Sequence, residues 1–170
     1  MTLHARQPRH TAPPEDEADQ SDAYFRFLQM LERLHRLMLD LIKDEFERIG
    51  RADLTPVQAM LIYHLGQQEV SAGELRSRGM YQGSNVSYNL KKLVSGGYVT
   101  QMRSDQDRRA LRVSLSEEGR AVRDDIGRLF ARHADDLVAS GVLDDPPLDR
   151  VNRQAQRIER YWAEQIRYIY

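Results

Sequence analysis

Apolar side chains recur every three or four residues along the first third of this chain, which is the spacing of an amphipathic helix. The pattern begins after Ser21, a suitable N-cap, and ends at Gly50. Residues 1–20 differ, because they hold three of the six prolines and four acidic residues and have little to bury. We therefore expect a disordered arm followed by one long helix, whose apolar positions are Tyr24, Phe27, Leu28, Leu31, Leu34, Met38, Leu41, Ile42, Phe46 and Ile49.

Shorter helices are expected in the middle of the chain. Thr55 and Pro56 suit the start of one, which ends near Gly66. Ser71, three residues before a glutamate, opens another that extends to about Arg78. The next helix begins near residue 84, ends at a Gly-Gly pair, and has one apolar face formed by Val86, Leu90 and Leu93.

Two strands and two further helices complete the pattern. Residues 98–102 and 110–115 read as strands, and the polar segment RSDQDRR between them indicates a hairpin with a charged tip. Ser116 caps the next helix, which ends at Gly141 and Pro146-Pro147 and has an inner face of Val122, Ile126, Leu129, Phe130, His133 and Leu137. The last helix starts at Leu148, with apolar positions at Val151, Ala155, Ile158, Trp162, Ile166 and Ile169.

This order predicts a mainly α fold, a winged helix-turn-helix with long flanking helices. Only the middle of the chain is compact by itself, so the apolar stripes of the flanking helices need another partner, and a second copy is the simplest one. We expect a disordered acidic arm (1–20), an N-terminal dimerisation helix (21–52), a DNA-binding domain (53–115) and C-terminal dimerisation helices (116–170).

Composition and charge narrow the class of protein. The chain has no cysteine, which excludes disulfides and thiolate metal sites, and no apolar stretch long enough to cross a membrane. Its net charge is only −1, yet residues 71–115 contain eight Lys and Arg against three Asp and Glu. This concentration favours double-stranded DNA as a partner and a cytoplasmic, nucleoid-associated location.

The helix that begins near residue 84 carries the side chains expected to read DNA. Ser and Asn at a helix start are most often caps, but five polar residues in six positions exceed what one cap requires. Lys91 and Lys92 follow farther along, where they suit phosphates. We expect base contacts in a major groove from Ser84, Asn85, Ser87, Tyr88 and Asn89.

The hairpin is the second predicted DNA contact. Arg108 and Arg109 at its tip fit the minor groove, whose negative potential attracts guanidinium groups, while Arg103 and Arg112 flank the backbone. The alternative is a solvated turn in which Asp107 pairs with one arginine.

Residues 55–120 resemble the winged helix of MarR-family transcriptional regulators. The segment DQDRRALRVSLSEEGR matches that family's wing, and ELRSRGMYQGSNVSYNLKKLVSGGYV closely resembles the alphaproteobacterial LdtR-type branch, regulators associated with cell-wall L,D-transpeptidase genes. The resemblance covers about residues 24–138. It implies a homodimer, a wing supported by Asp107, a minor-groove arginine at Arg108 or Arg109, and often a small-molecule pocket. Gln101 departs from the family pattern, which has an arginine there.

Other readings of the candidate residues remain. Asp105 and Asp107 lack a histidine partner, and His133 with Asp136 lacks a third metal ligand, so we expect no enzyme, cofactor or metal site. By analogy with the family, a small-molecule effector would bind near His35, Met38, Met60 and His64, although core packing is the alternative for the methionines.

The predicted function is a homodimeric, sequence-specific regulator on a pseudo-palindromic operator, with half-sites about one helical turn apart. It would control cell-envelope genes. The alternative is an architectural or protein-binding winged helix, which would not prefer one operator over random DNA.

Overall fold

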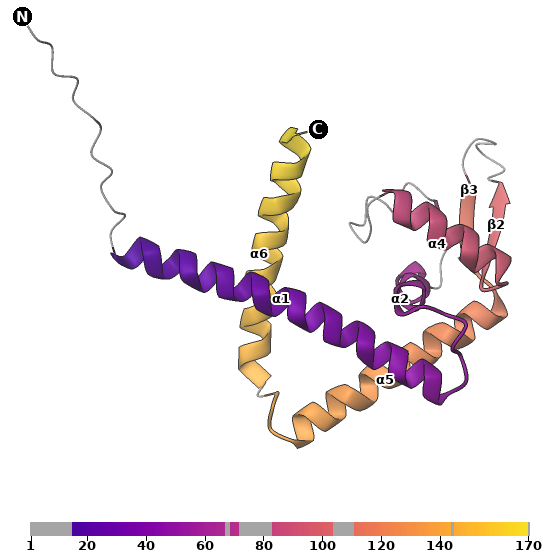
Figure 1. Ribbon diagram of the computed structural model, residues 1–170, viewed down its shortest axis with the longest axis horizontal. Helices are drawn as coiled ribbons and strands as arrows, with labels where there is room; N and C mark the ends of the chain where they lie inside the picture. The colour runs from indigo at the N-terminus through magenta and orange to yellow at the C-terminus, as the bar shows by residue number, and fades with distance from the viewer. Residues whose placement is uncertain (1–14, 67–68, 72–82, 104–110, 144, 170) are drawn as a thin grey trace, which may run out of the picture. The chain divides into compact units, whose positions relative to one another are not determined.

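The computed structural model describes residues 15–66, 69–71, 83–103, 111–143 and 145–169 (Figure 1). The chain divides into two units, residues 1–56 and 57–170. The first contains helix α1 (Glu15–Arg48). The second contains, in chain order, α2 (Pro56–Leu65), β1 (Val70–Ser71), α4 (Gly83–Ser95), β2 (Val99–Arg103), β3 (Leu111–Leu115), α5 (Glu117–Ala139) and α6 (Asp145–Ile169).

Helix α1 begins six residues before the predicted start at Ser21. Residues 15–20, which were assigned to the disordered arm, are helical, so that boundary was wrong. The acidic side chains taken as a sign of disorder also favour a helix N-terminus, because they interact well with its free N–H groups. The remaining residues of the predicted arm, 1–14, lie outside the described residues.

The C-terminal end of α1 is where the sequence placed it. Gly50 has a φ of 78°, and the N–H of Arg51 donates to the carbonyl oxygen of Phe46 at 2.7 Å. This is the Schellman arrangement, which glycine allows at no steric cost. Burial along α1 is concentrated near this end, where Ile42 and Phe46 are fully buried, while Leu34 and Leu37 are exposed.

The sheet is antiparallel, with strand order β1-β3-β2. Val99 pairs with Leu115 and Arg103 with Leu111, so the predicted hairpin is confirmed with its strands shifted by about one residue. Strand β1 was not predicted, because a two-residue strand has no periodicity to detect. It is held by pairing to β3, with Ser71 opposite Arg112. The helix predicted to follow Ser71 lies outside the described residues.

The two C-terminal helices differ in how well the sequence located them. Ser116 is the N-cap of α5, and its hydroxyl accepts from the N–H of Gly119 at 3.0 Å, as predicted. Helix α6 starts at Asp145 instead of Leu148. The two prolines at 146–147 were read as a helix stop, but proline fits the first turn of a helix, where its missing N–H has no intrahelical partner.

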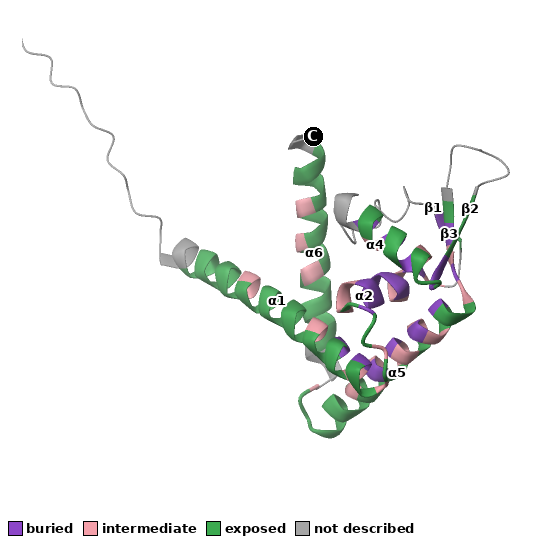
Figure 2. Cartoon of the chain, turned by 45° about the vertical axis from the view of Figure 1, so that its right-hand side comes forward, coloured by how far each residue is buried: buried purple, intermediate pink, exposed green. Residues whose placement is uncertain are grey.

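The core of the second unit draws on every one of its described elements except α6. Helix α4 lies against β2, and α5 against β3. Figure 2 shows the buried residues on the sheet and on the facing sides of α2, α4 and α5. This core holds α4 and the hairpin in fixed relation, and its fully buried members include Leu61, Ile62, Leu65, Val70, Leu93, Val113, Val122, Ile126 and Leu129.

Candidate nucleic-acid interface

Helix α4 has one buried and one exposed face. Val86, Leu90 and Leu93 are all buried, as their three- and four-residue spacing predicted. Gly97 ends the helix with a φ of 79°, and the N–H of Tyr98 donates to the carbonyl of Leu93 at 2.9 Å. The apolar face therefore anchors α4 to the unit, and the opposite face is free to meet a partner.

The exposed face of α4 carries most of the described residues predicted to contact DNA. Ser87, Tyr88, Lys91 and Lys92 are exposed, whereas Asn89 is half-buried between the two faces. Ser84 and Asn85 belong to the first turn of α4, but their side chains lie outside the described residues. The exposed set combines hydroxyl groups, an aromatic ring and two ammonium groups, which suits a surface that meets both phosphates and base edges.

Tyr88 and Lys92 form a pair on this face. They lie four residues apart, one turn of helix, and the Lys92 ammonium is 5.8 Å from the centroid of the Tyr88 ring. The ring is 61% exposed even with this contact. The cation over the ring restricts how the ring can turn while leaving much of its surface open.

The wing contributes less to the described interface. Its strands are in place, but Asp107, Arg108 and Arg109 lie outside the described residues, and Arg103 is the last residue of β2. Arg112 on β3 lies 3.9 Å from the carboxylate of Glu69, and both side chains are nearly half exposed. This loose ion pair costs Arg112 little freedom to turn toward a phosphate.

Close backbone and hydrogen-bond contacts connect the end of α4, strand β2 and the start of α5. The Ser116 hydroxyl donates to the Gly97 carbonyl at 2.6 Å, and the Ser116 N–H donates to the Tyr98 carbonyl at 3.1 Å. A side chain at Gly119 would place its Cβ only 2.0 Å from the Tyr98 carbonyl oxygen. The sequence located the Ser116 cap, but it gave no sign that Gly119 is required, because this contact depends on how the backbone folds back.

The predicted effector residues divide between the two units. On α1, His35 is exposed and Met38 half-buried; on α2, Met60 is 6% exposed and His64 half-buried. Burial lowers the pKa of His64 below its usual 6.5. Because the first pair belongs to residues 1–56 and the second to residues 57–170, a shared pocket stays a prediction.

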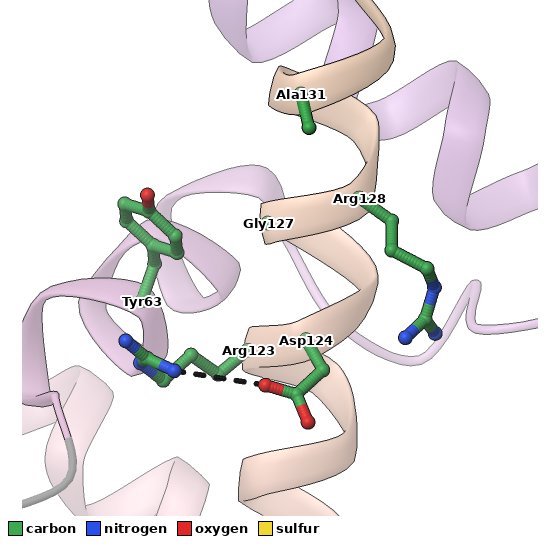
Figure 3. A pocket seen from close by; sticks show the side chains of 6 residues that line it. All are labelled: Tyr63, Arg123, Asp124, Gly127, Arg128 and Ala131. Atoms are coloured by element: carbon green, nitrogen blue, oxygen red, sulfur yellow. Dashed lines mark ion pairs between the residues drawn. The ribbon is translucent and has the colours of Figure 1, made fainter.

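An open cavity of about 410 Å³ lies between α2 and α5 (Figure 3). The Arg123 guanidinium lies 5.9 Å from the centroid of the Tyr63 ring and 3.6 Å from the Asp124 carboxylate. Sequence reasoning missed this cavity, because its walls come from two helices about 60 residues apart in the chain, and no motif marks them. None of the predicted effector residues lines it; its walls are Tyr63, Arg123, Asp124, Gly127, Arg128 and Ala131.

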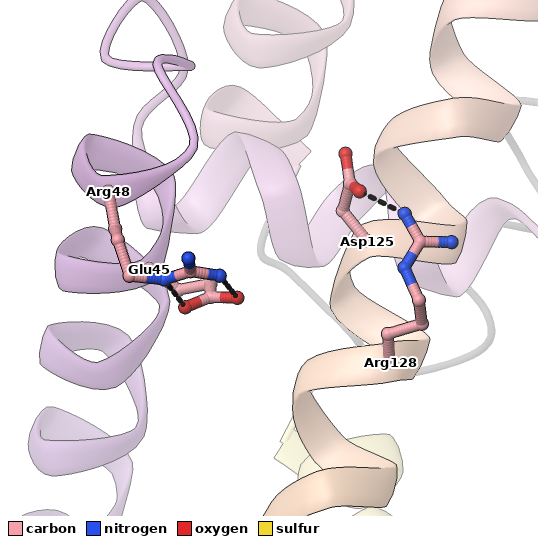
Figure 4. A network of polar contacts seen from close by, with 4 residues as sticks. All are labelled: Glu45, Arg48, Asp125 and Arg128. Atoms are coloured by element: carbon pink, nitrogen blue, oxygen red, sulfur yellow. Dashed lines mark hydrogen bonds and ion pairs between the residues drawn. The ribbon is translucent and has the colours of Figure 1, made fainter.

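Several arginines are occupied by neighbouring carboxylates on the same helix (Figure 4). Arg48 binds Glu45 through two hydrogen bonds of 2.8 Å, and this contact raises the pKa of Arg48. On α5, Arg128 pairs with Asp125 in the same three-residue spacing. These pairs occupy Arg48 and Arg128, whereas Lys91 and Lys92 of α4 form no ion pair with a described residue.

Metal and membrane sites find no support in the described part of the chain. No three of its His, Asp and Glu side chains gather as metal ligands would. Among its helices, none combines the length and hydrophobicity that crossing a bilayer requires.

Comparison with known proteins identifies the class. Residues 54–119 match the family described as a winged helix DNA-binding domain. The chain is 35% identical over 158 residues to the exopolysaccharide II synthesis transcriptional activator ExpG of Rhizobium meliloti (strain 1021), covering 91% of this chain and 81% of that protein.

The fold is also that of solved regulators. A MarR transcriptional regulator from Methanosarcina mazei Go1 is similar with a TM-score of 0.66 and 20% identity, over 81% of this chain and 96% of that one. A mutant MarR from E. coli complexed with operator DNA gives 0.64 and 14%, over 81% and 96%. The protein is thus a winged helix DNA-binding regulator of transcription and not an enzyme. It belongs to the family of the transcriptional activator ExpG, and its fold is that of MarR regulators.

Proposed function

We propose that this protein is a homodimer that binds a pseudo-palindromic operator in a sequence-specific way and regulates genes for a cell-surface or secreted polysaccharide. The observation that carries the proposal is α4, whose apolar face is buried while Ser87, Tyr88, Lys91 and Lys92 stand exposed on the other side. Such a helix can enter a major groove without losing its own support.

The dimer part of the proposal rests on exposed apolar stripes. On α6, Val151 and Ile166 are 54% and 58% exposed, and Ala155 and Ile158 are only half-buried. On α1, taken by itself, Leu31, Leu34, Leu37 and Leu41 are exposed. Apolar surface at helical spacing over two long helices needs a partner, and a second copy would supply one while matching the symmetry of a palindromic site.

The wing would supply affinity more than specificity. In the proposed complex, Arg108 and Arg109 enter the minor groove, Arg103 contacts the backbone, and Asp107 supports the tip. Removing one phosphate-contacting arginine should weaken binding to all sequences and reduce its salt dependence.

The named relative, an activator of exopolysaccharide synthesis, supports polysaccharide genes as the target. The LdtR-type resemblance of residues 74–99 suggests a second candidate, the cell-wall L,D-transpeptidase genes. Both candidates concern the cell envelope, and in either case the protein would act in the cytoplasm, on the nucleoid. In either case an effector bound near His35, Met38, Met60 and His64 would act by shifting the dimer between DNA-ready and unready spacings of the two α4 helices.

Genome-wide footprinting of the bound DNA tests the proposal. We expect a pseudo-palindromic motif upstream of polysaccharide genes, held tighter than random DNA by about 10³-fold or more at physiological salt. A motif upstream of transpeptidase genes would support the second target instead. Uniform occupancy of the DNA without a motif would identify an architectural protein. No occupancy at all would identify a protein-binding winged helix. Either result would overturn the proposal.

A further inference from the structure

We propose that Tyr88 reads a thymine in each operator half-site through the 5-methyl group of that base, with Lys92 holding the tyrosine ring in place. This inference rests on the proposed function, because it names the base that the exposed face of α4 recognises.

Tyr88 lies at the centre of that face. Lys91 lies three residues after Tyr88 and Ser95 seven residues after it, so all three share one side of the helix, and all are exposed. Val86, Leu90 and Leu93 occupy the other side. Counted from the N-terminus of α4, the end that contacts base edges in a helix-turn-helix, Tyr88 is the first large exposed side chain among the described residues.

The chemistry of the ring selects its partner. A 61% exposed aromatic ring on this face offers mainly apolar carbon. In the major groove, thymine alone carries an apolar group, its 5-methyl, and the other base edges present only hydrogen-bond donors and acceptors. The phenol hydroxyl could be satisfied by water or a phosphate at any sequence, so it discriminates little.

Lys92 fixes the ring for this contact. Its ammonium lies 5.8 Å from the ring centroid, which favours one ring orientation and keeps the positive charge beside the path of the DNA backbone. The lysine thus acts as a positioning residue for the ring, and Lys91, which makes no contact with the ring, offers a matched comparison of equal charge.

Deoxyuridine substitution tests the proposal, because it removes the thymine methyl and changes no hydrogen bond. Each thymine of the footprinted operator is replaced in turn, symmetrically in both half-sites, and binding of the full-length protein is measured by fluorescence anisotropy. For wild type we expect one symmetric pair of positions at which affinity falls by about fourfold per half-site, the worth of one buried methyl group.

Variants of Tyr88, Lys91 and Lys92 distinguish the contributions of the tyrosine ring, its hydroxyl group and the lysine charges. Tyr88→Ala should abolish the loss caused by deoxyuridine, and Tyr88→Phe should retain it. Lys92→Gln should weaken binding to operator and random DNA and shrink the deoxyuridine effect, whereas Lys91→Gln should weaken binding to both and leave that effect unchanged. Thermal melting of each variant, all at exposed positions, confirms the fold.

The outcomes that overturn the proposal differ from those that overturn the function. If wild type prefers its operator but no deoxyuridine pair weakens binding, the thymine contact is wrong and the regulator stands. The contact is equally wrong if Tyr88→Phe loses the effect together with Tyr88→Ala, or if Lys91→Gln and Lys92→Gln reduce it alike. If wild type shows no operator preference, the proposed function fails first.

Discussion

Helices α4 and α6 are both amphipathic, yet they use their apolar faces differently. The apolar face of α4 is buried within its own unit, where Leu93 is 1% exposed. The apolar stripe of α6 is open, and Ile166 on it is 58% exposed. The same sequence pattern therefore specifies folding in one helix, and in the other it leaves a surface for association. The spacing of apolar residues alone does not distinguish these two uses. Substitutions on the two helices can distinguish them.

The largest expected effect is on α4. Leu93→Ala removes a fully buried side chain from the contact between α4 and the sheet, so we expect the free energy of unfolding to fall by about 2–5 kcal/mol. Urea denaturation measures the change. Because this face is buried within one chain, the loss should be the same at low and high protein concentration, and a concentration-dependent loss would contradict the comparison.

The next largest effect is expected on dimerisation, from a substitution on α6. Ile166→Glu places a charge in the apolar stripe, and we expect the dimer dissociation constant to rise by about 100-fold or more, while each monomer stays folded. Analytical ultracentrifugation measures the mass. Gln156→Glu adds the same charge at an exposed position of α6 outside the stripe and should leave the dimer intact; equal effects of the two would refute dimerisation through the stripe.

These two helices also show what could be predicted from the sequence. The ends and the buried face of α4 were correct, because Val86, Leu90 and Leu93 and the glycines after them are local signals. Strand β1 was missed, because Val70 is held by a partner 43 residues away. The start of α1 was misplaced, since acidic residues suit both a disordered segment and a helix N-terminus.

The features of the candidate interface also divide into those that could be predicted from the sequence and those that could not. The exposed residues of α4 could be named in advance, since each follows from its position relative to the apolar face. The cavity beside Arg123 could not, because its walls come together only when α2 meets α5. The close approach of Gly119 to the Tyr98 carbonyl was hidden for the same reason: it is a contact between segments that no local pattern records.

A smaller effect is expected at the N-cap of α5. Ser116→Ala removes the acceptor for the Gly119 N–H and the donor to the Gly97 carbonyl, so we expect a loss of about 1 kcal/mol in the free energy of unfolding. Ser140→Ala, at the exposed other end of the same helix, should change stability by less than about 0.5 kcal/mol. Equal losses at the two ends would show that the cap plays no special part.

The smallest effect is on pH dependence. Burial lowers the pKa of His64 in the folded chain, whereas the unfolded chain binds its proton near the usual 6.5. The folded state is therefore favoured above about pH 6.5, and the free energy of unfolding contributed by this group declines as the pH falls further. His64→Gln should flatten that decline below about pH 6.5 in thermal melts, and an unchanged slope would refute the assignment.

The Gly119 contact has a mechanical meaning for the wing. The α5 backbone at Gly119 lies directly against the Tyr98 carbonyl, and Ser116 ties the start of α5 to Gly97, so these backbone segments are in direct contact. We expect strand β2 and the first turn of α5 to move together as a rigid body. A change in the tilt of α5 is therefore expected to move the base of the wing with it.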